Sequence, residues 1–171
     1  PVLSRGLGDV YKRQPKYGLA YGSLYGTRIE DEEISLGSSD VYKVHAVYES
    51  LDDNAARVPF ITMQDATIFQ KGTIIEGVTS KAKARVVNFN SVSYVCHFVY
   101  ENDKFFQLGE SVTGFNANNV VITGIINDAD GSIDDGSKNI TSSFFLDTNQ
   151  QGHYYDISKL VRFAQSTKPL R

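Results

Sequence analysis

The residues most able to do nucleophilic or metal chemistry in this chain are one cysteine and three histidines. Cys96 and His97 are a nominal nucleophile and base, but neighbouring residues of a strand point to opposite faces, so the imidazole cannot activate the thiol. His45, His97 and His153 form no H-E-x-x-H motif and no i, i+4 pair of the kind that binds zinc on a helix. A lone cysteine in an apolar stretch excludes an internal disulfide and favours a buried thiol.

Acidic residues are the other candidates for chemistry. Asp52 and Asp53 are a carboxylate pair of the type that glycoside hydrolases use, although acidic pairs in loops are usually just solvated. The stretch NDADGSIDDGSKN, residues 127–139, suggests a calcium loop, but an EF-hand needs aspartate five residues before its glycine, where Ile126 and Gly131 stand. We interpret this stretch as a solvated connecting loop. Because GxSxG and phosphate-loop motifs are also missing from the sequence, we expect no catalytic residue, no cofactor and no metal site.

The composition is that of an ordinary globular protein. The chain has 171 residues, of which 41% are hydrophobic and 22% charged, enough for one domain with or without an insertion. Lys and Arg number 17 against 20 Asp and Glu, and no basic run occurs, so nucleic acid is not an expected partner. No window approaches the ~20 apolar residues of a membrane helix, so we expect no membrane insertion.

The N-terminal stretch 1–14 ends in DVYKRQ, which resembles one translation frame of the transposon mosaic end used to prepare sequencing libraries. We therefore expect 1–14 to be an artefact outside the fold, in a fragment of a longer reading frame from environmental DNA. An ordinary polar lead-in segment is the alternative.

Short apolar runs separated by turn residues predict a mostly β chain built of short-stranded antiparallel sheets. VYKVHAVY, residues 41–48, alternates in the manner of a half-buried strand. FITM (60–63), ATIF (66–69) and VSYVCHFVY (92–100) are further strand candidates. DISKLVRFAQ, residues 156–165, is the one segment compatible with a short helix.

Three tyrosines near the start of the chain are each followed by glycine, in YGLAYGSLYG. Their spacing of four puts Tyr17, Tyr21 and Tyr25 on one face of an extended strand and the glycines on the other. The bare face would let another backbone approach; a flexible loop is the alternative. A tyrosine face would leave apolar surface exposed on a monomer, which favours a homo-oligomer.

A faint internal repeat follows. FQKGTIIEGVTSKAKARVV begins at Phe69 and FQLGESVTGFNANNVVITG begins at Phe106, and the two share Phe-Gln-x-Gly and a later glycine. Each copy predicts strand, glycine turn and strand, with Gly77 and Gly114 at equivalent turn positions with φ > 0. A chance pairing of two hairpins is the alternative.

Near the C-terminus, LDTNQQGHYYDISKLVR resembles a motif in large virion structural proteins of contractile-tailed bacteriophages, many of them marine. EISLGSSDVYKVHAVYES, residues 33–50, resembles the segment that precedes that motif, and the Phe-Gln-x-Gly hairpins resemble the small β modules between the two. Asn149 and Gln150 depart from the glycine and glutamine usual in the family, which puts the tightness of that turn in doubt. The resemblance implies an assembly role in the tail, baseplate or attached fibres, with other virion proteins as partners, as a homo-oligomer and possibly a trimer. It implies no cofactor.

The two resembling segments flank the repeat, so we expect an outer β unit, 17–64 with 136–171, interrupted by a hairpin module, 65–135. Residues expected at turns, seams or interfaces are Tyr17, Tyr21, Tyr25, Gly77, Gly114, Asp147, Tyr154, Tyr155 and Asp156. The two aspartates would anchor turns, and the later tyrosines would pack the module on its neighbour. A carbohydrate-binding or host-recognition module, with exposed aromatics, is the second hypothesis. A polysaccharide-degrading enzyme fragment, with a carboxylate-lined groove, is the third.

Overall fold

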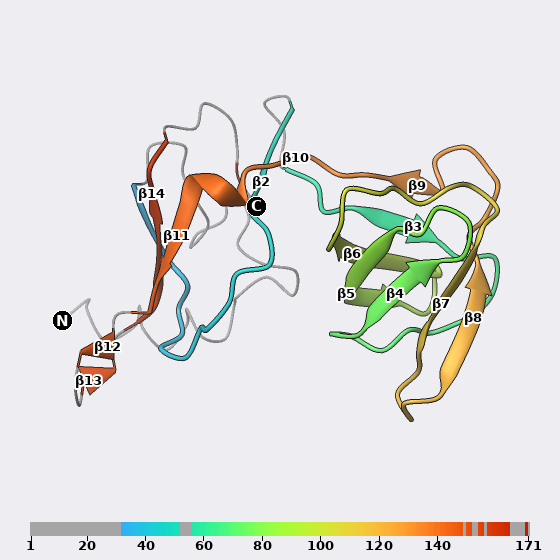
Figure 1. The fold of residues 1–171 in the computed structure, drawn as a ribbon, viewed down its shortest axis with the longest axis horizontal. Coiled ribbons are helices and arrows are strands. Elements are labelled where there is room, and N and C mark those ends of the chain that lie inside the picture. Colours follow the sequence, from blue (N-terminus) through green and yellow to red (C-terminus); the bar gives the residue numbers. More distant parts are fainter. Residues whose placement is uncertain are drawn as a thin grey trace. The chain divides into compact units, whose positions relative to one another are not determined.

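The computed structural model describes residues 32–51, 56–148, 150–151, 154–155, 157–164 and 170 (Figure 1). Apart from one short 3-10 turn, η1 (Thr141–Ser143), every described element is a strand, and every strand pairing is antiparallel. The prediction of a mostly β, antiparallel chain is therefore confirmed.

The chain divides into two compact units. The outer unit comprises the described residues before Val58 and after Gly136, and the inserted unit is Val58–Gly136. The inserted unit starts before the predicted boundary at residue 65, because strand β3 (Phe60–Thr62) pairs with strands β6 (Val95–Tyr100) and β9 (Ile133–Asp134) of that unit.

The outer unit is built around a three-stranded sheet of order β1-β14-β11, formed by β1 (Glu33–Ser35), β14 (Lys159–Arg162) and β11 (Phe144–Asp147). Two smaller ladders accompany it, one joining β2 (Tyr48–Glu49) to β10 (Lys138–Asn139), the other joining β12 (Gln150–Gln151) to β13 (Tyr154–Tyr155). Its small core consists of Ile34, Val47, Phe144, Leu160 and Leu170.

Strand β14 replaces the helix that the sequence allowed in this segment. Leu160 lies opposite Ile34 on one side and Leu146 on the other, so it is buried between two partner strands, while Lys159 and Val161 point to the other face. Burial with period two is strand packing, and partners distant in sequence override the weak local preference for a helix.

The predicted strand over residues 41–48 does not form, apart from Tyr48 within β2. Burial there does not alternate, because Val47 and Tyr48 are both buried although they are neighbours. The Val47 backbone instead bonds to the turn at η1: its N–H donates to Thr141 Oγ1 and its carbonyl accepts from the Ile140 N–H. The predicted strand over 66–69 is also missing, since the Asp65 carboxylate accepts bonds from the Thr67 N–H and hydroxyl and turns the chain.

The inserted unit is one curled sheet of order β8-β7-β4-β5-β6-β3-β9. Its remaining strands are β4 (Ile74–Gly77), β5 (Lys83–Asn90), β7 (Ser111–Phe115) and β8 (Val121–Ile125). The sequence β4-β5-β6 is a meander whose last strand lies beside β3, which is a Greek-key connection.

The curl brings β3 and the end of β8 together. The Gln64 N–H donates to the Ile125 carbonyl, the Asn127 N–H donates to the Thr62 carbonyl, and Met63 bridges Ile126. Twelve buried residues fill the enclosed space: Ile61, Met63, Phe69, Ile75, Ala82, Ala84, Val86, Cys96, Phe98, Phe106, Val112 and Ile126.

The two Phe-Gln-x-Gly segments have the same local structure. In each, the residue after the glycine donates its N–H to the glutamine carbonyl, from Thr73 to Gln70 and from Glu110 to Gln107, both at 3.3 Å. The glycines Gly72 and Gly109 have φ of 86° and 71°, which a type II turn requires at its third residue. The preceding Phe69 and Phe106 are both buried.

The prediction that Gly77 and Gly114 occupy turns with φ > 0 is wrong. Gly77 is the last residue of β4, Gly114 lies within β7, and neither has a positive φ. They are glycines for a different reason, because a Cβ at Gly114 would lie 2.7 Å from Ile75 Cγ2 and from Phe69 Cδ1, and a Cβ at Gly77 would lie 2.7 Å from Glu110 Oε2. Each glycine therefore makes room for a side chain that lies over the strand.

Alanine substitution can separate the two reasons for glycine in this unit, which are lack of space at Gly114 and positive φ at Gly72. Gly114→Ala is expected to lower the free energy of unfolding by about 1–3 kcal/mol through overpacking against Phe69. Gly72→Ala, where a Cβ would meet nothing within 4 Å but φ is +86°, serves as control. It is expected to lose about 1–2 kcal/mol through backbone strain alone.

Phe69→Leu is added to each glycine variant, and the free energy of unfolding is measured by urea denaturation followed by circular dichroism. The comparison shows whether the loss at each glycine depends on the Phe69 ring. The Gly114→Ala loss should partly cancel in the double variant, whereas the Gly72→Ala loss should simply add. If the losses in free energy of unfolding add fully in both double variants, the Phe69 ring is not the reason that position 114 requires glycine.

Candidate functional site

The candidate site is the outward face of strands β4, β7 and β8. Ile75 and Val112 point into the core, so their neighbours along each strand point outward. We call these outward residues the outer face: Ile74, Glu76, Val78, Ser111, Thr113, Phe115, Val121, Thr123 and Ile125.

Strand register arranges the outer face in three rows. Glu76 pairs with Thr113, and Thr113 with Thr123, which makes the middle row polar. Lys83 extends this row from β5 and lies 3.3 Å from the Glu76 carboxylate. The rows on either side are largely apolar: one contains Ile74, Phe115 and Val121, and the other contains Val78, Ser111 and Ile125.

The apolar members of the outer face remain largely uncovered. Ile74, Val78, Phe115, Val121 and Ile125 are each between 41% and 59% exposed. A shallow groove of about 430 Å³ is lined by the first four of these residues and by Lys81, but not by Ile125. Single exposed apolar residues are ordinary, but four on three adjacent strands, with Val78 directly after β4, make a contiguous patch of the kind that marks a contact surface.

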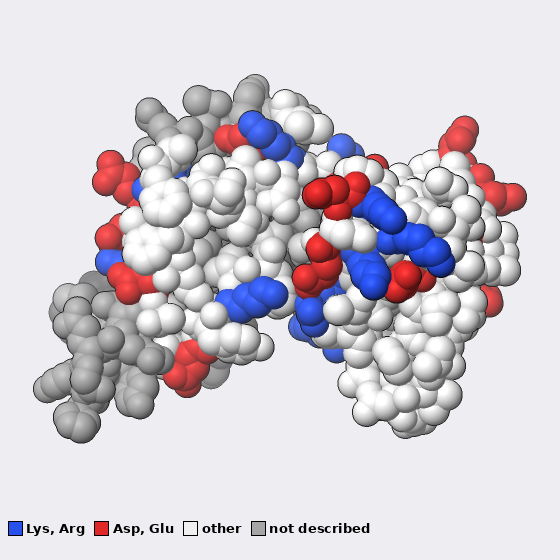
Figure 2. Space-filling view, viewed as in Figure 1, with Lys and Arg blue, Asp and Glu red and all other residues white. Residues whose placement is uncertain are grey.

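The hairpin that carries most of this face has no charge. From Ser111 to Asn127 the sequence contains no Asp, Glu, Lys or Arg. Figure 2 shows the β7–β8 hairpin as an uncharged lobe on the visible face, while charged side chains gather over the neighbouring strands of the inserted unit. Water-excluding contact with another surface would therefore desolvate few ionic groups here.

A buried carboxylate bonds the loop that contributes to the groove lining. Glu110 is 6% exposed, and its Oε2 accepts the N–H groups of Thr79 and Ser80 at 3.2 and 3.0 Å. Its Oε1 accepts the Ser80 hydroxyl at 2.9 Å and the Gln107 N–H at 2.7 Å. These bonds fix the β4–β5 loop, which places Val78 and Lys81 in the groove lining.

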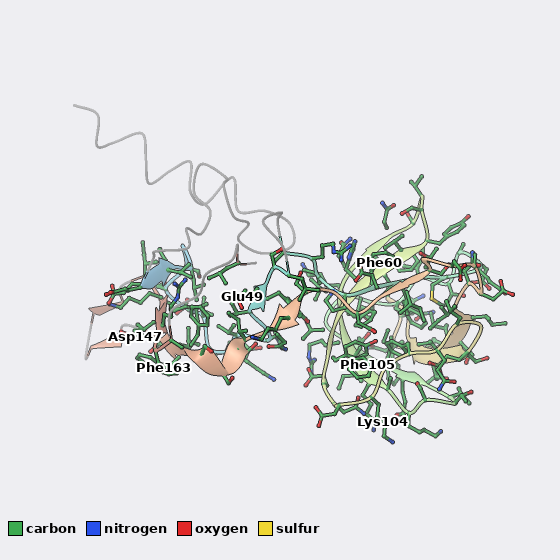
Figure 3. The ribbon with its side chains drawn as sticks, turned by 90° about the horizontal axis from the view of Figure 1, so that it is seen from above. Glu49, Phe60, Lys104, Phe105, Asp147 and Phe163 are labelled. Atoms are coloured by element: carbon green, nitrogen blue, oxygen red, sulfur yellow. The ribbon has the colours of Figure 1, made fainter. Side chains whose placement is uncertain are left out.

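A second exposed aromatic group lies in the outer unit. Phe145 of β11 and Phe163, which follows β14, stack with ring centroids 6.0 Å apart and planes at 10°, and they are 45% and 66% exposed. On the same sheet, Lys159 Nζ lies 2.9 Å from Glu33 Oε1 and 3.9 Å from Asp147 Oδ2. Figure 3 labels Asp147 and Phe163 of this group. An aromatic platform therefore stands beside a row of charged groups.

The residues predicted from sequence are only partly brought together. Gly77 and Gly114 both line the groove, through backbone rather than as turn residues. Asp147 pairs across the sheet with Lys159 in the outer unit, and the backbones of Tyr154 and Tyr155 form β13. Tyr17, Tyr21, Tyr25 and Asp156 lie outside the described residues.

Sequence reasoning missed the residues that form the two exposed surfaces. Phe115, Val121 and Ile125 carried one signal, the uncharged stretch around them, while Phe145 and Phe163 carried none that distinguishes exposed from buried rings. Glu110 was not singled out, because the loop residues Thr79 and Ser80 that bond its Oε2 lie some thirty residues earlier in the chain.

Cys96 and His97, the nominal nucleophile and base, both lie on β6 of the inserted unit, whereas Asp52, Asp53 and His153 lie outside the described residues. Cys96 is fully buried, and burial raises the pKa of its thiol to about 12, so it is protonated at neutral pH. The His97 ring packs edge-on against Phe60 with centroids 5.9 Å apart. Within the part of the chain that the structure describes, no three acidic, cysteine or histidine side chains are grouped as metal ligands, and no helix is long and apolar enough to cross a membrane.

Comparison with protein-family models, with curated proteins and with solved structures gave no match to this chain.

Glu110 provides a direct test of how the groove is held in place. Glu110→Ala should lower the free energy of unfolding by about 2–4 kcal/mol, because three backbone N–H groups and one hydroxyl lose a charged acceptor. The stability of Glu110→Gln should lie between that of Glu110→Ala and that of the unsubstituted protein. The amide keeps one acceptor oxygen, but its NH₂ group is placed against N–H donors.

The matched control is Glu101→Ala, which removes a carboxylate 2.7 Å from Arg85 Nε at a more exposed position. It should change stability by less than about 1 kcal/mol. Hydrogen exchange at Thr79 and Ser80 should accelerate in Glu110→Ala alone; equal exchange in the two variants would contradict the assigned role.

Proposed function

We propose that this chain is a non-enzymatic structural subunit of a bacteriophage tail or baseplate, and that the outer face is one of its assembly contacts. The observation that carries this proposal is the contiguous exposed apolar surface on β4, β7 and β8. The resemblance of residues 33–50 and 146–162 to virion structural proteins supports the same role and supplies the kind of particle.

The outer face is suited to assembly because it is already in place before contact. The two type II turns, the Glu110 bonds and the side chains packed over Gly77 and Gly114 hold its strands and one adjoining loop. A preformed surface loses little conformational entropy on association, so more of the contact energy appears as affinity.

The size of the apolar contribution can be judged from exposure. Full burial of such a side chain contributes about 1.5–3 kcal/mol, and covering the exposed half of five of them contributes about 4–7 kcal/mol. Association costs an estimated 4–15 kcal/mol in lost translation and rotation. Burial of the outer face therefore contributes to the binding free energy of a contact but does not by itself make the association stable. Additional hydrogen bonds or other contacts at its margin are required.

The role is tested in a bacterial culture infected by a phage whose genome encodes this chain. Particles are purified, tails are separated from capsids, and both fractions are digested with trypsin. The peptide of residues 72–81, which lies between Lys71 and the cleavage after Lys81, should appear in the tail fraction at a fixed ratio to known tail proteins. Its presence in the cell lysate only would overturn the assembly role.

Glycan binding by the outer unit is a second candidate function, favoured by the exposed stack of Phe145 and Phe163 beside charged groups. Apolar sugar faces stack on such rings, and carboxylates or ammonium groups bond the hydroxyls. Phe163→Ala should abolish retention on a glycan array, whereas the control Phe105→Ala, which removes a ring 56% exposed on the inserted unit, should not. Equal retention by both variants would remove this candidate.

A further inference from the structure

Strand β8 presents an unpaired backbone edge beside the outer face. It stands at one end of the sheet order, with β7 as its ladder partner. The Ile125 carbonyl accepts from Gln64 rather than from β7, whereas the Ile126 N–H donates back to Glu110. Because backbone groups alternate in direction along an antiparallel strand, Val121 and Thr123 direct their N–H and C=O groups away from β7, as Ile125 does.

These groups are not bonded by any residue that the structure describes. At the other end of the strand order, by contrast, the edge of β3 that faces away from β6 is covered by residues 126–134, through β9 and the bonds at Thr62. Proteins usually protect an open edge with Lys, Pro or a bulge, and β8 has none of these. Its sequence VITGI is uncharged and rich in β-branched residues, which suits strand addition.

We propose that β8 is the seam of a two-fold dimer, in which it pairs antiparallel with β8 of a second copy of this chain. Val121 of each copy lies opposite Thr123 of the other, and Ile122 lies at the axis. Each Val121–Thr123 pair exchanges two N–H···O=C bonds, so the seam contains four backbone hydrogen bonds.

The register follows from the groups that remain open. Centring the pairing on Thr123 would place Val121 opposite Ile125, whose carbonyl already accepts from Gln64. Centring it on Val121 would place Thr123 opposite Asn119, a turn residue with φ of 56°. Only the register centred on Ile122 pairs the unbonded backbone groups of Val121 and Thr123 in each copy without using a turn residue or an occupied carbonyl.

The partner is a second copy because a two-fold seam places each residue against its own strand. Like charges would then face each other and repel, and the uncharged stretch 111–127 contains none. The pairing also continues the outer faces of the two copies across the seam, which adds backbone bonds at the margin where the apolar face needs them.

This inference rests on the proposed assembly role for its choice of a subunit as partner, but its test in solution is separate from the particle experiment. A seam that fails while the chain still fractionates with tails leaves the assembly role standing. The trimer that the resemblance implies stays a separate prediction, and the tyrosines at 17, 21 and 25 that favour a homo-oligomer lie outside the described residues.

The first measurement is sedimentation velocity of the full chain over a range of concentrations, with four proteins compared. The unsubstituted chain and the control Val92→Lys, which adds a charge at a loop residue 90% exposed, should dimerise equally. Val121→Lys should raise the dimer dissociation constant at least ~10-fold by placing charge in the seam. Thr123→Pro should have the same effect while keeping its circular dichroism spectrum, because proline at this position removes only an outward N–H.

The second measurement reads the register. Val121→Cys and Thr123→Cys proteins are oxidised separately and as a mixture. Opposed residues in a hydrogen-bonded pair have Cα atoms ~5.5 Å apart, within the range that a disulfide spans. Buried Cys96 contributes little background.

The mixture should give a cross-linked dimer and the separate proteins much less. An unsubstituted chain that stays monomeric, a Val92→Lys effect equal to that of Val121→Lys, or equal cross-linking of Thr123→Cys alone would each overturn the seam.

Discussion

The pairing of β4 with β7 is the interaction on which the inserted unit depends. It joins the two Phe-Gln-x-Gly hairpins edge to edge, with Glu76 opposite Thr113, residues that hold the same place in the two copies. The ladder therefore has a local two-fold relation, and its two glycines lie symmetrically about that centre. Everything beyond it, β5 and β6 on one side and β8 on the other, is added outward until the curled sheet meets itself at Met63 and Ile126.

In the two Phe-Gln-x-Gly repeats, different side chains fill the space over the equivalent glycines. The ring of Phe69 lies over Gly114, whereas the carboxylate of Glu110 lies against Gly77, and Phe106 packs instead on Phe98 with ring centroids 5.2 Å apart. An apolar cover makes one half of the unit a hydrophobic core. A polar cover makes the other half a hydrogen-bonded loop, and that loop borders the groove. The asymmetry between copies thus separates the part that stabilises the fold from the part that shapes its surface.

Sequence reasoning succeeded where local pattern determines structure and failed where distant partners do. Antiparallel β class followed from short apolar runs and turn residues. The segment around Lys159, which was compatible with a short helix, is a strand because one of its two partner strands contains Glu33, 126 residues earlier, and no local pattern shows that partner. The glycines of the repeat were noticed, but a sequence does not tell which pair needs positive φ, as Gly72 and Gly109 do, and which pair needs empty space. Exposure of Phe115 or Phe163 depends on what fails to cover them, which is a property of the whole fold.

The place where the chain leaves and re-enters the outer unit has a mechanical consequence. The Arg57 N–H donates to Ser137 Oγ at 2.7 Å and the Ser137 N–H donates to the Arg57 carbonyl at 2.9 Å, next to the short ladder of β2 with β10. These contacts join the two crossing segments within the outer unit. While they hold, tension applied along the outer unit passes from one segment to the other through this joint and does not stretch the inserted unit. Tension on the outer unit therefore bypasses the curled sheet, which keeps its shape as long as these two hydrogen bonds hold.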